Sequence, residues 1–269
     1  MTPKRIPGWI GICLTVLFLA SCSTVPVTGR QQLDLVSSGQ VLAMSTDAYK
    51  DFISKNEVIT GTEESGTVKR VGERIRSAVE EYLKREGQSE ILQGYNWEFN
   101  LVKDDSVNAW AMPGGKVVVY TGILPVTRDE AGLATVMGHE VAHAIAKHGN
   151  ERMSQQLLTQ LGGMALSVAL SQNPAQTNDM FMAAYGMGTQ VGVLLPFSRL
   201  QESEADRLGM IFMAMAGYDP RAAVDFWQRM SDKSQGGAPP EFLSTHPAHG
   251  TRIDRIQEYL PEALAYYRK

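Results

Sequence analysis

The residues best suited to chemistry are His139, Glu140 and His143, which form the pattern HExxH. In a helix, side chains four positions apart lie on one face, so both imidazoles can reach one metal ion. Glu140 projects about 100° further round the helix and lies beside such an ion instead of binding it. Two neutral imidazoles hold zinc, and a carboxylate that is not a ligand takes the proton from the activated water. The pattern therefore predicts a catalytic zinc site.

The segment that carries this motif is expected to be one buried helix. A capping box of Thr127 and Glu130 predicts a start at Arg128, and Gly149 predicts the stop. His148 then lies in the last turn, where a cation suits the helix dipole, and we expect a structural role for it. The alternative is a surface helix that carries two histidines by chance. Apolar residues cover much of the motif helix, however, and unpaired histidines would be unfavourable in a buried helix.

A zinc site of this type needs a third ligand, and we place it on a second helix, expected from Arg199 to about Ala216. The chain lacks the glycine and histidine that follow HExxH in three-histidine peptidases. Glu202 and Asp206 share a face of the second helix, whereas Glu204 lies about 200° from Glu202 and points elsewhere. We assign Glu202 as the ligand and Asp206 as the acceptor that orients a ligand histidine. The alternative, an acidic first turn that only suits the helix dipole, leaves the motif without a third ligand.

Together, the segments HEVAH and ESEAD resemble the zinc metallopeptidase family of the CAAX prenyl endopeptidases and the bacterial heat-shock membrane proteases. More closely, the chain resembles the soluble periplasmic lipoprotein branch of that family. The resemblance implies zinc bound by His139, His143 and Glu202, with Glu140 as general base. It also implies a zincin-like fold of the gluzincin type and a role in outer-membrane protein quality control. Further shared segments, in the family's order, are Pro26–Arg30, Asn108–Gly115 and Ser244–Pro247.

The N-terminus has the layout of a bacterial lipoprotein signal. Two basic residues precede an apolar run over 10–20, which is about half the length needed to span a bilayer. Leu19–Cys22 resembles a lipobox, so residues 1–21 are expected to be removed as a signal peptide and Cys22 to be lipidated. Ser23 resembles the pattern for outer-membrane sorting. The predicted location is the periplasm, with the chain anchored to the inner leaflet of the outer membrane. An ordinary secreted protein is the alternative.

Composition narrows the function further. The chain has 25 Lys and Arg against 29 Asp and Glu, and no basic block suggests binding to nucleic acid. Cys13 leaves with the signal peptide and Cys22 is lipidated, so the mature chain has no disulfide and no thiol ligand. Zinc must therefore be held by nitrogen and oxygen.

The mature chain is long enough for one large domain, expected at 38–269 after a lipidated tether at 22–37. Helical patterns dominate, but one stretch alternates apolar and polar residues, and two short strands flank a Pro-Gly-Gly turn. The predicted fold class is α+β, a mostly helical domain with one small sheet beside the active-site helix. The expected elements are helices at 39–53 and 63–85, a strand at 96–102 and a hairpin of 108–112 with 116–120.

Several residues have roles that the sequence leaves open. His246 matches a family position near the zinc, and we count it among the catalytic residues. Three roles are open for it: a hydrogen-bond donor to the developing oxyanion, a reversible fourth ligand that keeps the enzyme latent, or a histidine that only stabilises its loop. Asn108 and Arg252 are weaker oxyanion candidates. A second metal site at His246 and His249 lacks neighbouring carboxylates. The strand 108–112 either aligns a peptide as an added strand or only holds the sheet together.

The segment 154–198 contains a single charged residue and two long apolar runs. It is expected to form a helical hairpin or a mobile cover that binds unfolded chains or rests on a membrane. Plain burial in the body is the alternative.

The predicted function is zinc-dependent endoproteolysis of unfolded or misassembled envelope proteins, with outer-membrane assembly machinery as a further partner. The alternative is a chaperone-like periplasmic lipoprotein that binds clients with little or latent proteolysis. The intact Glu140 argues against a pure binding protein, which needs no base. A purely structural zinc is disfavoured because three protein ligands with an open position describe a catalytic site.

Overall fold

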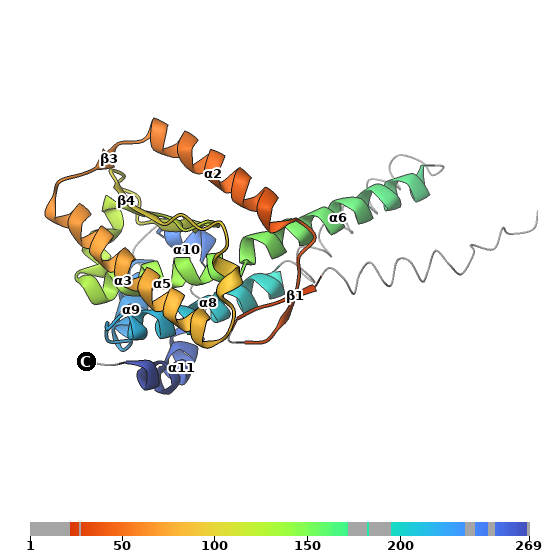
Figure 1. Cartoon of the computed structure of the whole chain (residues 1–269). Helices are drawn as coiled ribbons and strands as arrows, with labels where there is room; N and C mark the ends of the chain where they lie inside the picture. Colours follow the sequence, from red (N-terminus) through yellow and green to blue (C-terminus); the bar gives the residue numbers. More distant parts are fainter. Residues whose placement is uncertain are drawn as a thin grey trace, which may run out of the picture.

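A four-stranded sheet lies between helix α2 (Ser38–Lys55) and the rest of the helical body (Figure 1). The computed structural model describes residues 22–26, 28–171, 182, 195–234, 240–246 and 251–267. The strands are β3 (Val58–Ile59), β4 (Glu98–Val102), β5 (Ala109–Met112) and β6 (Lys116–Tyr120), in the order β3-β4-β6-β5. β4 and β6 are parallel, and the other two pairs are antiparallel. Strand β4 and the β5–β6 hairpin confirm the small sheet predicted from the sequence.

The central strand β6 packs on both faces because its successive side chains alternate in direction. Val117 and Val119 lie in the main core with the body helices, whereas Val118 packs with Tyr49 beneath α2 (Ser38–Lys55). The sheet is therefore the middle of three layers, with α2 on one face and the helical body on the other (Figure 1). This arrangement fits the predicted α+β class.

Helix α5 (Glu130–Ile145) lies at the centre of the body, and each of its residues from Gly132 to Ile145 is buried. It contacts α3, α8, α9 and strand β5. The remaining helices are α3 (Glu63–Arg85), α4 (Leu124–Thr127), α6 (His148–Leu170), α8 (Leu195–Met215), α9 (Ala222–Ser234), α10 (Glu241–Thr245) and α11 (Arg252–Tyr266), with 3₁₀ turns η1 (Ser89–Leu92) and η2 (Thr121–Ile123).

Helices α5 and α8 touch through their backbones at a pair of glycines. A Cβ added to Gly138 would lie 2.8 Å from the carbonyl oxygen of Gly209, and one added to Gly209 would lie 2.8 Å from the backbone nitrogen of His139. Such distances leave no room for a side chain at either position. The glycines therefore permit a helix crossing close enough to bring the side chains of α5 and α8 together.

The ends of α5 differ from the prediction. The helix begins at Glu130, after Asp129, whose side chain accepts a hydrogen bond from the Gly132 amide at 2.8 Å. The predicted capping box at Thr127 is therefore wrong, because Thr127 ends the short helix α4. The predicted stop at Gly149 is also wrong. Helix α5 ends at Ile145, and the chain turns through Lys147, which has φ of 55°, into α6.

The residues predicted as a tether contain a small sheet. Strands β1 (Cys22–Thr24) and β2 (Gln31–Leu33) pair antiparallel, and Val25 between them is fully buried. The amide of Leu35 donates to the Ser154 hydroxyl at 2.9 Å, which joins this segment to α6. The segment is thus packed on the helical body as well as leading to it. The predicted signal peptide at 1–21 lies outside the described residues.

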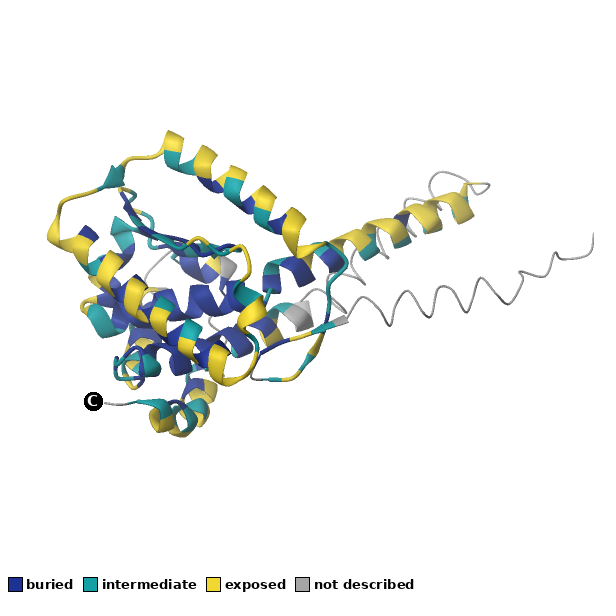
Figure 2. Cartoon of the chain, in the orientation of Figure 1, coloured by how far each residue is buried: buried dark blue, intermediate teal, exposed yellow. Residues whose placement is uncertain are grey.

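Helix α6 projects from the body (Figure 1), and its outer half is largely exposed (Figure 2). Leu157, Leu161, Met164 and Val168 recur at helical spacing and are 40–74% exposed. Plain burial of the segment 154–198 is therefore wrong for these side chains. The second apolar run of this segment, at 186–197, lies outside the described residues except for 195–197, which begin α8. No helix in the described part of the chain is long and apolar enough to cross a bilayer.

Candidate metal centre

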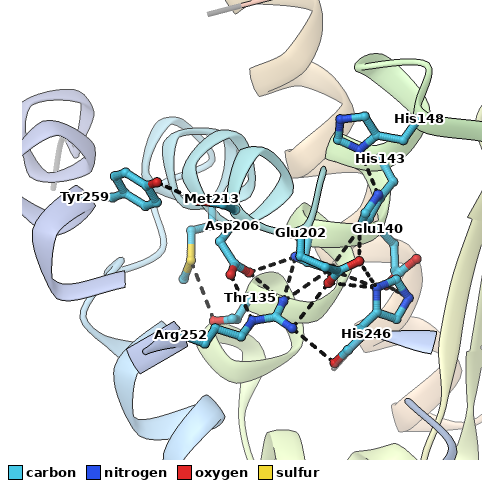
Figure 3. Close-up of polar contacts among 12 residues, drawn as sticks. Thr135, Glu140, His143, His148, Glu202, Asp206, Met213, His246, Arg252 and Tyr259 are labelled. Carbon is cyan, nitrogen blue, oxygen red and sulfur yellow. Dashed lines mark hydrogen bonds and ion pairs between the residues drawn. The ribbon is translucent and has the colours of Figure 1, made fainter. Parts of the chain in front are cut away.

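Four side chains from three separate parts of the chain meet at one point. His139 and His143 come from α5, Glu202 comes from α8, and His246 follows α10. Their ligating atoms all lie within 4.8 Å of one another, and all four residues are buried. Figure 3 shows His143, Glu202 and His246 converging. The three metal ligands predicted from the sequence are therefore brought together, with His246 beside them.

The spacing of these atoms fits a zinc ion. His139 Nε2 lies 3.1 Å from His143 Nε2, and His246 Nδ1 lies 3.0 Å from Glu202 Oε1. His143 Nε2 lies 3.3 Å from the same Glu202 oxygen. Donors bound tetrahedrally at about 2.0–2.1 Å from zinc lie roughly 3.3–3.4 Å apart. A cluster of nitrogen and oxygen donors also agrees with the absence of a thiol ligand in the predicted mature chain.

The hydrogen-bond network turns the Nε2 atoms of the two motif histidines toward each other. His139 Nδ1 lies 2.9 Å from the Asp206 carboxylate and donates to it. His143 Nδ1 lies 2.8 Å from His148 Nδ1, and the other nitrogen of His148 faces a carboxylate and must carry its proton. His143 Nδ1 is then the donor, and the Nε2 atom of His143 is unprotonated. Its 3.1 Å separation from His139 Nε2 is repulsive unless a proton or a metal cation lies between the two nitrogens.

The charges around the cluster also favour a cation. Burial alone would lower the pKa of His139, but Asp206 and Glu202 outweigh it and raise this pKa to about 9. Burial holds the pKa of His143 well below its usual value, so this imidazole is neutral, as a ligand must be. The site thus combines a neutral ligand with carboxylates that stabilise positive charge.

Glu140 lies next to the cluster but is not one of its donors. Its Oε1 is buried and has no hydrogen-bond partner among the described residues. His246 Nε2 is 3.3 Å away, within range of an ion pair. A buried carboxylate oxygen without a hydrogen-bond partner is unfavourable, and it has capacity to accept a proton or a hydrogen bond from water. This is the position that the HExxH spacing predicted for Glu140.

Asp206 and Arg252 form a second layer of support behind His139. The guanidinium of Arg252 binds both oxygens of Asp206 at 2.8 Å, and its Cζ lies 3.4 Å above the Trp227 ring. It also lies 3.2 Å from Glu202 and donates to the His246 carbonyl at 3.1 Å. These contacts show Arg252 supporting the residues of the cluster, whereas the oxyanion role stays a prediction.

Burial alone would raise the pKa of Asp206, but the charge of Arg252 and the hydrogen bond from His139 lower it. Asp206 is therefore an ionised carboxylate that accepts a hydrogen bond from His139. Asn108 lies immediately before β5, where its amide donates to Glu241 at 3.2 Å.

The position of His148 differs from the one predicted from the sequence. His148 is not in the last turn of α5 but opens α6, is fully buried, and has a pKa lowered by burial, so it is not a cation at a helix end. Glu204 is not one of the cluster's donors, in line with the helical spacing, but its Oε2 lies 3.2 Å from His148 Nε2. In one continuous helix His143 and His148 would lie about 140° apart. The turn at Lys147 brings them together. His249 lies outside the described residues.

Comparison with known proteins agrees with this geometry. The family model of Peptidase family M48 matches residues 69–260. Mitochondrial metalloendopeptidase OMA1 of Schizosaccharomyces pombe is 34% identical over 92% of this chain and 69% of its own length. The mitochondrial OMA1 metalloendopeptidase of Homo sapiens is 31% identical over 94% of this chain, which spans 49% of that relative. The beta-barrel assembly-enhancing protease of Escherichia coli is 32% identical over 58% of this chain and 33% of its own length.

The matched range covers most of the chain and contains all four donors as well as Glu140 and Asp206. The metallopeptidase family expected from the motif is thereby confirmed at the level of the whole family. The chain belongs to Peptidase family M48 and is a metalloendopeptidase with zinc as its cofactor.

Proposed function

We propose that this chain is a zinc endopeptidase that cleaves unfolded or misassembled envelope proteins. The observation that carries the proposal is the convergence of His139, His143 and Glu202 beside a buried Glu140 oxygen that has no hydrogen-bond partner among the described residues. A structural zinc site has no use for an uncoordinated carboxylate at this place, whereas hydrolysis requires one.

The residues take the following roles. His139, His143 and Glu202 hold the ion, and zinc when bound supplies Lewis-acid activation of water and of the scissile carbonyl. Glu140 accepts the proton of the attacking water on its free oxygen and delivers it to the leaving amine. Asp206 keeps the proton of His139 on Nδ1, so that Nε2 remains available to the ion.

His246 is proposed to hold the site in a latent form. Its Nδ1 lies 3.2 Å from His139 Nε2 and 3.0 Å from Glu202, which makes it a fourth donor. Four protein donors describe a closed zinc site, whereas a catalytic site keeps one position open. Substrate binding therefore requires His246 to withdraw.

Strand β5 is proposed to align the substrate. It ends the order of the four-stranded sheet and contacts α5, the helix that carries the motif. An outer strand offers backbone NH and C=O groups that a peptide can pair with in any sequence. Unfolded chains are suited to this mode because their backbone is free. The name of the Escherichia coli relative, which refers to β-barrel assembly, supports an outer-membrane client.

We further propose that the chain is a periplasmic lipoprotein of the soluble branch, anchored through Cys22 after removal of residues 1–21, with one peptidase domain at 38–269. The lipobox supports the anchor. The exposed apolar residues on α6 support contact with unfolded clients or with the membrane surface. Outer-membrane assembly machinery is the further partner proposed.

A binding role with latent proteolysis is the second candidate, and the closed donor cluster favours it. In that case the chain holds unfolded clients and cuts them only after His246 is displaced. The two candidates share one site and differ in how often it opens.

Digestion of reduced casein by the zinc-loaded chain tests both. We expect cleavage by the wild type, none by Glu140→Gln, and faster cleavage by His246→Ala, with peptides identified by mass spectrometry. Equal cleavage by wild type and Glu140→Gln would contradict the assignment of the base. Cleavage only after the His246→Ala change would favour the latent binding protein.

A further inference from the structure

We propose that Thr28 and Arg30, in the N-terminal segment, are positioning residues for the zinc ligand His143. This inference rests on the zinc site proposed above. The two residues act through Glu204 and His148, which form a chain of contacts from the turn between β1 and β2 to the centre of the molecule.

Arg30 joins two buried carboxylates that belong to different helices. Its guanidinium binds Glu151 of α6 through Nη1 and Nη2 at 2.7 and 2.8 Å. It binds Glu204 of α8 through Nε and Nη2 at 2.9 and 2.8 Å. The Thr28 hydroxyl donates to the same Glu204 carboxylate at 2.8 Å. Glu151 and Glu204 are 1% and 4% exposed, so their mutual repulsion is poorly screened without Arg30.

Glu204 in turn determines how His148 is protonated. Its Oε2 lies 3.2 Å from His148 Nε2, and an ionised carboxylate can only accept. His148 therefore carries its proton on Nε2 and offers the lone pair of Nδ1. His143 Nδ1 lies 2.8 Å from that atom and must be the donor.

The consequence reaches the metal-binding atom. With its proton held on Nδ1, His143 presents an unprotonated Nε2 to the donor cluster, in a fixed ring orientation. Partners of this kind, behind the ligands, orient them and set their basicity. The unusual feature here is that the last partners, Thr28 and Arg30, lie more than one hundred residues before the ligand, next to the predicted lipidation site.

The test is the zinc dissociation constant of the full-length chain, measured by competition with a chromophoric chelator. We expect Arg30→Met to weaken zinc binding by about tenfold, the low end for residues behind a metal ligand. Thr28→Val removes one hydrogen bond and should weaken binding about threefold. Arg30→Lys keeps the charge and should recover part of the loss. Cobalt-substituted protein should show a changed visible spectrum in Arg30→Met, because the geometry at His143 changes.

The matched control is Arg207→Met. Arg207 binds Glu262 with two hydrogen bonds of 2.7 and 2.9 Å, also from α8, but its contacts do not lead to a ligand. Its zinc affinity should equal that of the wild type. If Arg30→Met and Thr28→Val also bind zinc as the wild type does, while the metal-free melting temperature falls, the pair only anchors the N-terminus and the proposal is overturned.

His143→Ala separates this proposal from the zinc site itself. Loss of zinc in His143→Ala with full affinity in Arg30→Met overturns only the positioning role. Unchanged affinity in His143→Ala overturns the zinc site and the positioning role together. If Arg30→Met does not fold, Thr28→Val decides the question, because it leaves every charge in place.

Discussion

The two motif histidines of α5 are supported by different parts of the molecule. His139 donates directly to Asp206, one turn after Glu202 on α8. His143 reaches a carboxylate only through His148, whose other nitrogen faces Glu204. The first support is one contact between two packed helices. The second passes through a turn, a third helix and the N-terminal segment.

This difference shows that two side chains on the same helix can be held in place by different parts of the structure. Asp206, which supports His139, lies where α5 and α8 are in close contact, and its carboxylate is paired with the buried Arg252. The support of His143 ends at Arg30, whose side chain is 16% exposed. We therefore expect larger effects from changes behind His139 than from changes behind His143.

Asp206→Ala should have the largest effect. It removes the acceptor of His139 and the carboxylate that binds the buried Arg252 guanidinium through two hydrogen bonds, which costs about 3–5 kcal/mol of folding free energy. Urea unfolding of the metal-free protein measures this loss. The double variant Asp206→Ala with Arg252→Met should regain part of the lost folding free energy. A loss below about 1 kcal/mol in Asp206→Ala alone would show that the pair is not buried as described.

Gly209→Ala should come next. The added Cβ would approach the backbone nitrogen of His139 to 2.8 Å, so the two helices must separate, at about 1–3 kcal/mol. Zinc affinity should fall with stability because Glu202 moves with α8. Gly149→Ala is the control, since an added Cβ there meets nothing within 4 Å. Equal stability of the two variants would contradict the close crossing.

Glu204→Gln should lower zinc affinity by about tenfold, less than Asp206→Asn, because it acts through His148. Burial alone would raise the pKa of Glu204, but hydrogen bonds from His148, Arg30 and Thr28 lower it to about 2, so the ionised form is the native one. Isothermal titration of the two variants with zinc compares the supports directly. A larger loss in Glu204→Gln would reverse the proposed order.

Arg207→Met should have the smallest effect. Its ion pair with Glu262 is about one-third exposed, and such pairs contribute about 0–1 kcal/mol. Thermal unfolding with and without zinc should give the same zinc-induced shift as the wild type. A reduced shift would mean that the α8–α11 contact also supports the metal centre.

The sequence determined the parts of this site that depend on local geometry. HExxH places His139 and His143 on one face of a helix, and a spacing of four places Asp206 beside Glu202, whatever the rest of the fold does. The strand at 96–102 and the turn before β6 were also recognised from alternation and from a Pro-Gly-Gly sequence.

Only the tertiary structure decided the contacts that depend on a break between two helices or on how helices cross each other. His148 meets His143 because the chain turns at Lys147, and no periodicity predicts a left-handed residue that is not glycine. Glu204 meets Arg30, and His246 meets the motif histidines, across more than one hundred residues. Helical periodicity places neighbours within one element, whereas these partners are placed by how the helices pack, which here depends on two glycines without side chains.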